Sequence, residues 1–261
     1  MELQSLGFRT ELALLERSGS EVVDRGTHLV VRTPDNPSFH WGNCLVLPAA
    51  PAAGEVEGWV EEHRREFGAP HVTLGIDTTD GKRLKPLRRA GLHVDLVQAM
   101  SADAVVPPPR PASDLVARRL SGDGDWGQLV DLTLAGEEDD PHVTREFVER
   151  RTDAYRHLVE AGHGHWWGAF VDGDLASSLG VFRAGDGLAR FQSVKTHPDA
   201  RGRGLCGTLV HHAGVDALAS LDAATLVMCA DPSYSAIRIY RSVGFRDAGL
   251  HAEATLRPTA S

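Results

Sequence analysis

Apolar positions along the first hundred residues switch between helical and strand-like spacing. Glycine and proline mark the ends of several of these segments, as at Gly68, Pro86 and Gly91. The segments predicted here are a helix over 6–16, strands over 27–32 and 43–47, a helix with Val56, Trp59, Val60 and Phe67 on one face, a strand over 71–76, a helix from Pro86 to Gly91, and a strand over 92–99.

The same order of strands and helices returns at greater length after residue 114. Asp140 and Pro141 resemble an N-cap and a first-turn proline, and Asp172-Gly173-Asp174 is a hairpin signal. The predicted elements are a strand over 115–120, helices over 126–135 and from Asp140 to about Ala161, strands over 166–171, 175–182 and 188–194, a helix over about 202–218, a strand over 225–229, a helix over 233–242 and a strand over 246–256.

A proline-rich stretch separates the two series of elements. Residues 105–113 read Val-Val-Pro-Pro-Pro-Arg-Pro-Ala-Ser, and proline removes backbone donors and disfavours helix. This predicts a stiff linker at 107–114 between a domain over 1–106 and a second over 115–261. Residues 87–92 also align with residues 240–245, which indicates a diverged duplication.

Composition narrows the class of protein. The chain has 261 residues, of which 42% are hydrophobic and 24% charged, and no apolar run is long enough to span a membrane. The N-terminus lacks the features of a secretory signal, so a cytoplasmic location is expected. Three widely spaced cysteines and two closely spaced histidine pairs do not match a disulfide framework or a metal site.

The net charge of -9 argues against a nucleic-acid partner and suits a cationic small molecule or peptide. Charge that only maintains solubility is the simpler explanation.

The segment 191–209 carries the clearest chemistry. An apolar strand enters a glycine-rich turn, and the turn opens a helix with Leu205, Leu209 and Ala213 on its apolar stripe. The first N–H groups of such a helix are unpaired and lie at its positive end, which makes the turn a candidate anion site for a pyrophosphate. A dinucleotide-binding site also fits Gly202, Gly204 and Gly207, but too little chain follows for the remaining parallel strands.

Two motifs resemble the GNAT superfamily of acyl-CoA transferases. Arg201-Gly202-Arg203-Gly204-Leu205, with Val194 and Pro198 upstream, is similar to the family's phosphate-binding signature, although Cys206 replaces a glycine or alanine. Residues 231–245, from Asp231 to Phe245, are similar to its second motif, with Ser233 in place of asparagine.

The resemblance implies an α/β fold with mixed α+β sheets, in which two GNAT-like domains each have a centrally splayed sheet flanked by helices. It also implies that acetyl-CoA is bound as acyl donor, with no metal, and that Tyr240 is the general acid that protonates the leaving thiolate. A core aromatic is the structural alternative for Tyr240. The implied cofactor-binding residues are Val194, Thr196, Arg201, Gly202, Arg203, Gly204, Leu205, Cys206, Gly207 and Ser233.

A general base is harder to identify. The strand before the glycine turn offers Arg190, Gln192 and Ser193, none of which is an obvious base. The acidic run Glu137-Glu138-Asp139-Asp140 falls where the family lines its acceptor pocket, although a solvated loop is the commoner role of such a run. Asp231, His165 and Glu253 are weaker candidates, and an acyl-cysteine at Cys206 is rejected because that position faces the phosphates.

The first half has the element order without the chemistry. Residues 48–54 lack the paired glycines and the arginine, and Leu87 aligns with Tyr240. We therefore expect a degenerate first half and a catalytic second half that transfers an acetyl group directly to a primary amine, from a small molecule acceptor. A non-catalytic acyl-CoA sensor is the alternative. The expected partners are acetyl-CoA and the amine, with neither nucleic acid nor membrane, and a homodimer is compatible with the sequence.

Overall fold

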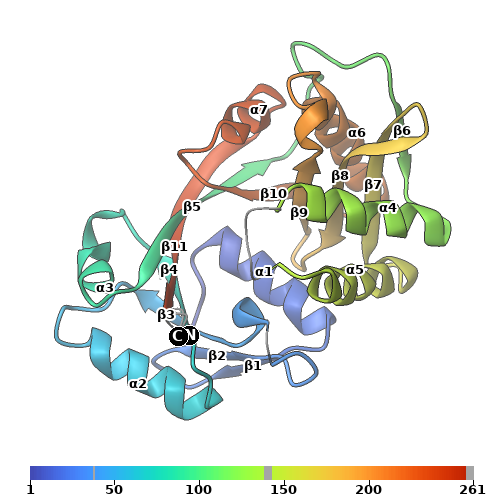
Figure 1. The fold of residues 1–261 in the computed structure, drawn as a ribbon. Helices are drawn as coiled ribbons and strands as arrows, with labels where there is room; N and C mark the ends of the chain where they lie inside the picture. The colour runs from blue at the N-terminus through green and yellow to red at the C-terminus, as the bar shows by residue number, and fades with distance from the viewer. Residues whose placement is uncertain (38, 138–142, 257–261) are drawn as a thin grey trace. The chain divides into compact units, whose positions relative to one another are not determined.

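The computed structural model describes residues 1–37, 39–137 and 143–256 (Figure 1). The chain divides into two compact units. Unit 1 comprises residues 1–100, 229–234 and 247–261, and unit 2 comprises residues 101–228 and 235–246. Each unit is therefore built from more than one stretch of chain.

Among its described residues, unit 1 contains three α-helices and almost all of six strands. Helices α1 and α2 are amphipathic, and Gly68 ends α2, as predicted, in a left-handed conformation with φ of 60°. The elements are α1 (Leu6–Arg17), β1 (Glu21–Asp24), β2 (Leu29–Arg32), β3 (Cys44–Ala49), α2 (Val56–Phe67), β4 (Val72–Thr78), α3 (Lys85–Arg89), β5 (His93–Ala102) and β11 (Arg246–Leu256), with short 3-10 turns at His40–Gly42 and Lys82–Leu84.

The last strand of the chain is part of the unit 1 sheet. The strand order is β1-β2-β3-β4-β11-β5, and β11 runs antiparallel to β4 with Ala252 opposite Ile76 and Ala254 opposite Leu74. Both alanines are fully buried in a core that also includes Leu45. Unit 1 therefore depends on residues about 150 positions beyond β5 for the strand that lies between β4 and β5.

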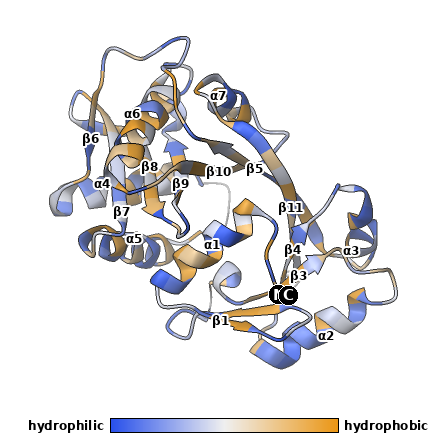
Figure 2. Ribbon diagram, turned by 180° about the vertical axis from the view of Figure 1, so that it is seen from behind, coloured by the Kyte–Doolittle hydropathy of each residue, from blue (hydrophilic) through white to orange (hydrophobic). Residues whose placement is uncertain are grey.

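In the part that the structure describes, unit 2 contains four α-helices and the rest of the strands. Here α4, α5 and α6 pack against strands β7 to β9. Figure 2 shows hydrophobic colour along β8, and mixed hydrophobic and hydrophilic colours along α5. The elements are β6 (Val116–Arg119), α4 (Gly122–Ala135), α5 (Arg145–Glu160), β7 (Gly164–Val171), β8 (Asp174–Arg183), β9 (Leu188–Thr196), a 3-10 turn (Pro198–Ala200), α6 (Leu205–Ser220), β10 (Thr225–Ala230) and α7 (Ala236–Ser242).

The two units repeat one pairing scheme. In unit 1, β1, β2 and β3 pair antiparallel in sequence and β3 pairs parallel with β4 across α2. In unit 2, β7, β8 and β9 pair antiparallel and β9 pairs parallel with β10 across α6. The shared scheme supports the duplication predicted from the aligned helix ends, and the strands of each unit form both parallel and antiparallel pairs, as a mixed sheet requires.

Most predicted elements are confirmed to within a few residues, with three differences. Strand β1 was not predicted because three of its four residues are exposed and carry no apolar pattern. Helix α5 begins later than predicted, at Arg145, because Thr144 is extended and its Oγ1 accepts the N–H of Phe147 at 3.2 Å. The predicted N-cap at Asp140 lies outside the described residues.

The compact units also differ from the predicted domain ranges, since 107–114 lies in unit 2 and β11 in unit 1.

No helix in the described part of the chain has the length and hydropathy that crossing a bilayer requires.

A buried histidine makes unit 1 sensitive to acid. His63 of α2 is fully buried, and burial lowers its pKa from 6.5 to about 4. One ring nitrogen, Nε2, lies 3.3 Å from the carbonyl oxygen of Asn43, whereas Nδ1 has no hydrogen-bond partner among the described residues. The folded state therefore holds this ring neutral at a pH where an unfolded histidine is protonated.

We predict that the free energy of unfolding falls as pH drops from about 6.5 to about 4, by up to about 1.4 kcal/mol per pH unit from this group. In that window the unfolded state binds a proton that folded His63 does not. Urea unfolding followed by circular dichroism at several pH values measures the slope. His63→Leu should flatten it, whereas His93→Asn, at an exposed position, should not. Equal slopes in wild type and His63→Leu would contradict the assignment.

Candidate active site

Strand β9 pairs with its parallel neighbour β10 along only the first part of its length. The parallel register pairs Leu188 with Thr225 and ends at Arg190 with Val227, while β9 continues to Thr196. On its other side β9 pairs with β8, but the register shifts between Ser178 and Gly180, which lie opposite Lys195 and Gln192. Ser193 has φ of 49°, so β9 bulges there. Backbone groups of the second half of β9 are consequently available for a ligand on the β10 side.

The glycine turn follows this strand, as predicted. Gly202 and Gly204 have φ of 78° and 80°, in the left-handed region that favours glycine. Gly204 is the N-cap of α6 and supplies no side chain to cap the first helical amides. A Cβ added at Gly202 would meet no atom within 4 Å, so this side of the turn is open. The N-terminus of α6 is open and has no side-chain cap, and it follows a strand whose pairing with β10 has already ended. Such a helix N-terminus is suited to bind a phosphate.

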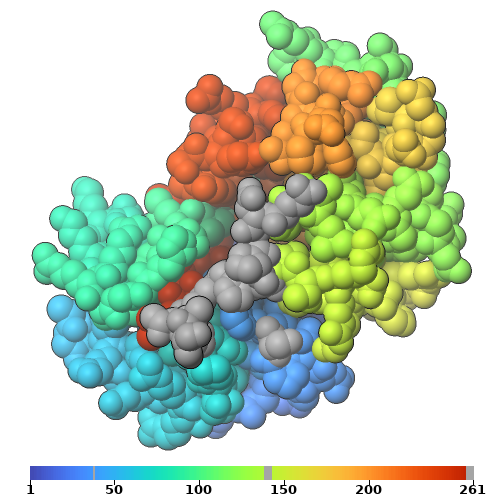
Figure 3. Space-filling model, in the orientation of Figure 1, coloured from blue at the N-terminus to red at the C-terminus, as the bar shows by residue number. Residues whose placement is uncertain are grey.

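The proline-rich segment packs on the same helix instead of spanning open solvent. A Cβ on Gly204 would lie 2.5 Å from the carbonyl oxygen of Arg110, and one on Gly207 would lie 3.1 Å from Cβ of Pro108. The N–H of Ala112 donates to Oγ1 of Thr208 at 2.9 Å. Figure 3 shows residues of this segment, in green, against the orange atoms of α6.

These contacts show that the three glycines of the turn differ in what lies next to them. Gly204 and Gly207 lack side chains where the proline-rich segment lies, whereas Gly202 faces open space. Arg203 of the turn forms an ion pair with Asp114, and this pairing lowers the pKa of the Asp114 carboxyl. The sequence predicted all three glycines as a phosphate cradle, and the structure gives two of them an additional packing role.

Cys206 is a poor nucleophile in this setting. Burial raises the pKa of its thiol to about 12, so the thiol stays protonated at neutral pH. This agrees with rejecting an acyl-cysteine intermediate.

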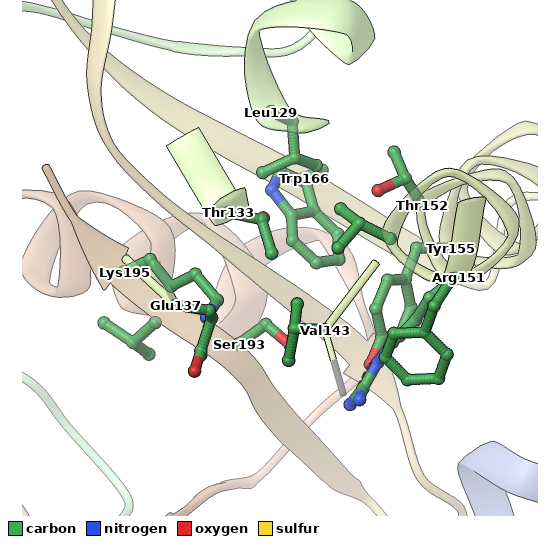
Figure 4. A pocket seen from close by; sticks show the side chains of 13 residues that line it. Leu129, Thr133, Glu137, Val143, Arg151, Thr152, Tyr155, Trp166, Ser193 and Lys195 are labelled. Carbon is green, nitrogen blue, oxygen red and sulfur yellow. Dashed lines mark hydrogen bonds and ion pairs between the residues drawn. The ribbon is translucent and has the colours of Figure 1, made fainter. Parts of the chain in front are cut away.

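A cavity of about 290 Å³ lies in unit 2 beside the bulge of β9 (Figure 4). Helices α4 and α5 and strands β7 and β9 supply its walls, which combine apolar and polar side chains. Its described lining consists of Leu129, Thr133, Glu137, Val143, Phe147, Val148, Arg151, Thr152, Tyr155, Trp166, Ser193, Val194 and Lys195.

At one end of the cavity Glu137 meets Lys195. Their Oε1 and Nζ atoms are 2.5 Å apart, and both side chains are partly exposed. The sequence favoured a solvated loop for the acidic run, but Glu137 lines the cavity and is its only carboxylate among the described lining residues. Glu138, Asp139 and Asp140 lie outside the described residues.

At the other end, in Figure 4, Tyr155 and Arg151 of α5 point toward one another. Oη of Tyr155 accepts from Nε2 of Gln192 at 3.0 Å and from Nε and Nη2 of Arg151 at 3.1 and 3.0 Å. Gln192, one of the three β9 residues that the sequence did not favour as a base, binds Tyr155 through its amide. The sequence did not single out Tyr155, Arg151 or Lys195. Residues 151 and 155 are one helical turn apart, but their common role depends on where α5 meets β9.

The remaining predicted residues are distributed over both units. Tyr240 is buried in α7 of unit 2, a helix that contacts α6, and it is not among the described cavity-lining residues. Ser233 belongs to unit 1, and its N–H and hydroxyl both donate to Oδ1 of Asp231 at 2.7 Å. These hydrogen bonds from Ser233 lower the pKa of Asp231, which weakens it as a base. Glu253 also lies in unit 1.

His165 lies on β7, where its Nε2 is 3.2 Å from Oγ of Ser220, and burial lowers its pKa. It is not among the described residues that line the cavity. Within residues 1–37, 39–137 and 143–256, no group of three or more His, Cys, Asp or Glu side chains is arranged to hold a metal ion.

A family match covers the region that contains β9, the glycine turn and α6. Residues 162–247, which span β7 to the start of β11, match the family Acetyltransferase (GNAT) domain. None of the curated proteins compared with the sequence matches it.

Solved structures share the fold over most of the chain. A GCN5-related N-acetyltransferase from Kribbella flavida is 17% identical, with 97% of each chain covered and a TM-score of 0.67. A GCN5-related N-acetyltransferase from Sphaerobacter thermophilus is 18% identical, with 99% of this chain and 94% of that chain covered and a TM-score of 0.59.

A tandem GNAT protein from the clavulanic acid biosynthesis pathway is 16% identical, with 78% of this chain and 69% of that chain covered and a TM-score of 0.52. Residues 162–247 therefore match a GNAT acetyltransferase domain, and the chain shares its fold with GCN5-related N-acetyltransferases.

The open side of the glycine turn gives a direct test of the phosphate site. We predict that Gly202→Asp binds CoA about fivefold more weakly than Gly202→Asn, because a carboxylate repels the phosphates at the helix N-terminus. Aspartate and asparagine have nearly the same shape, and both tolerate the left-handed conformation better than other residues. Isothermal titration calorimetry measures the two affinities. Equal affinities would place the pyrophosphate elsewhere.

Proposed function

We propose that the protein transfers an acetyl group from acetyl-CoA directly to a primary amine of a small acceptor. One observation carries the proposal: strand β9 contributes to two features that such a reaction needs. Toward β10 the parallel register ends at Arg190, and the open glycine turn follows β9 in the chain. The cavity reaches Ser193, Val194 and Lys195 of the same strand.

Backbone groups of β9 and α6 form the proposed binding site for acetyl-CoA, the acyl donor. Backbone groups of Val194 and Thr196 bind the amides of the pantetheine arm, as the family resemblance implies. The first amides of α6 and the residues from Arg201 to Gly207 bind the pyrophosphate. Ser233, which replaces the family's asparagine, is a further predicted cofactor contact.

The acceptor side is the cavity. The amine nitrogen attacks the thioester carbonyl, a C–N bond forms and the C–S bond breaks. We assign Glu137 as the group that accepts the proton lost by the nitrogen, because it is the carboxylate in the described lining. Tyr240 donates a proton to the leaving sulfur.

The chemistry is proposed for the second half of the chain only. In the first half, β3 ends at Ala49 and α2 begins at Val56, and the connection between them lacks the paired glycines. We therefore retain a degenerate domain over 1–106 and a catalytic domain over 115–261, joined by the segment 107–114. The free thiols of Cys44, Cys206 and Cys229 suit a reducing cytoplasm, and we propose neither nucleic acid nor membrane as a partner.

A non-catalytic acyl-CoA sensor is the competing function. A sensor needs the glycine turn but has no use for a polar cavity beside the strand bulge. The presence of that cavity therefore favours the transferase.

Tyr240 distinguishes the two functions. We predict that Tyr240→Phe lowers acetyl-CoA turnover by roughly a hundredfold, since general acid catalysis contributes about that much, while CoA affinity changes less than about twofold. Thiol release across a panel of amines measures turnover, and calorimetry measures affinity. Tyr234→Phe, at an exposed tyrosine, is the matched control. Wild-type turnover in Tyr240→Phe would remove this residue from the mechanism.

Glu137 has its own test. We predict that Glu137→Gln reduces kcat by roughly a hundredfold without changing the KM for acetyl-CoA, because the amide has the same shape but accepts no proton. Lys195→Met breaks the same ion pair and retains the carboxylate. It should therefore lower kcat much less, and comparable losses in both variants would show that the ion pair matters instead of the base.

A further inference from the structure

The bulge of β9 places a serine in a conformation that favours glycine. Two residues of β9, Ser193 and Val194, lie opposite the single β8 residue Leu179. Ser193 has φ of 49°, in the left-handed region, and a bulge with its first residue in that region usually has glycine there. Serine is less stable than glycine in this conformation, so contacts elsewhere in the fold must hold it.

Gln192, the residue before Ser193, is held at both ends of its side-chain amide. Its Oε1 accepts from Nε of Arg190 at 3.0 Å, and its Nε2 donates to Oη of Tyr155 at 3.0 Å. A guanidinium can only donate, so the amide oxygen faces Arg190 and the amide nitrogen faces Tyr155. Because Gln192 is buried, loss of the bond to Tyr155 would leave a polar group in the interior without this partner.

Tyr155 is itself fixed on α5. Its ring contacts Trp166 with centroids 4.8 Å apart and stacks on Phe182 with centroids 6.0 Å apart. Its Oη also accepts from Nε and Nη2 of Arg151, one turn earlier in the same helix, at 3.1 and 3.0 Å. Helix α5 and strand β9 are thus connected through Tyr155 and Gln192, one residue before the bulge.

The chain beyond the bulge is held by β8. Oγ of Ser177, a fully buried residue, donates to the carbonyl oxygen of Lys195 at 2.7 Å and lies 2.9 Å from Oγ1 of Thr196. Ser193 therefore lies between two fixed points, one provided by α5 and the other by β8.

The bulge decides which backbone groups β9 directs toward β10. The N–H of His197 donates to the carbonyl oxygen of Ala176 of β8 at 2.9 Å. Backbone groups of successive strand residues face opposite sides, so those of Thr196 and Val194 face β10. A slip of one residue would reverse this arrangement and direct them toward β8.

We infer that Tyr155 is a positioning residue for the binding of acetyl-CoA. Its hydrogen bond to Gln192 holds the bulge at Ser193 in place. The bulge in turn keeps the backbone groups of Val194 and Thr196 directed toward β10. The inference rests on the proposed donor site and names the contact that sets its geometry. In this scheme Tyr155 touches neither acetyl-CoA nor the reacting atoms.

A double-mutant cycle tests the inference. Tyr155→Phe removes the hydroxyl and retains the ring, and we expect it to bind CoA about fivefold more weakly, the weight of one neutral hydrogen bond. Ser193→Gly makes the left-handed conformation favourable by itself. In that background Tyr155→Phe should therefore weaken CoA binding by less than about twofold. Isothermal titration calorimetry of wild type, the two single variants and the double variant measures this coupling.

Two further variants complete the design. Tyr234→Phe makes the same change at an exposed tyrosine and should bind CoA like wild type. If Tyr155→Phe loses its circular dichroism spectrum, Gln192→Leu removes the same hydrogen bond from the β9 side and is measured in both backgrounds. Unchanged CoA affinity in a folded Tyr155→Phe or Gln192→Leu would overturn the inference. An equal loss with Ser193 and with Gly at this position would also overturn it, because a merely structural role predicts that result.

Failure of the proposed donor site is recognised separately. If wild type binds no CoA, that site fails, and hydrogen exchange of a peptide over residues 191–197, followed by mass spectrometry, decides the role of Tyr155. Faster exchange in Tyr155→Phe, with a smaller effect in the Ser193→Gly background, supports Tyr155 as the residue that holds the bulge. Equal exchange in wild type and Tyr155→Phe overturns it.

Discussion

The early end of the pairing between β9 and β10 is the constraint on which the site depends. A paired strand uses its N–H and C=O groups within the sheet, so a ligand has no access to them. Here the parallel register ends at Arg190, and the bulge at Ser193 shifts the register with β8. One strand thereby supplies free backbone toward β10 and contributes residues to the wall of the cavity. The glycine turn and α6 follow directly from the end of this strand.

The glycines of the turn show how one motif serves two physical purposes. Gly202 faces open space and suits an approaching phosphate, whereas a side chain on Gly204 would collide with the carbonyl oxygen of Arg110. The sequence predicted a linker in the proline-rich segment and a phosphate cradle in the glycines. The structure connects the two features, because the segment can lie on α6 only where Gly204 and Gly207 have no side chain. The hydrogen bond from Ala112 to Thr208 secures that arrangement.

Local signals predicted most of the elements because each depends on neighbouring residues. Gly68 ends α2 through its own backbone conformation, and helical spacing marks α1 from Leu6 onward. The exposed strand β1 has no such signal, and it forms because β2 pairs with it. For the site, the residues from Val194 to Gly207 could be found by motif and Glu137 as one member of an acidic run, whereas Tyr155 could not be found. Acidic runs are common at protein surfaces and helical tyrosines are common in cores, and only their position beside β9 makes Glu137 and Tyr155 part of a cavity.

The amino-acid sequence by itself determined the order of strands and helices, the duplication, and the glycine turn that opens α6, since these depend on spacings of a few residues. The tertiary structure alone decided that β11 completes the sheet of unit 1, where Gln98 donates to the carbonyl oxygen of Gly249 across 151 residues of sequence. It also decided that Tyr155, Gln192 and Arg151 converge. Such contacts join residues that are distant along the chain, and their formation depends on how whole elements bury their apolar faces. No local pattern encodes that choice.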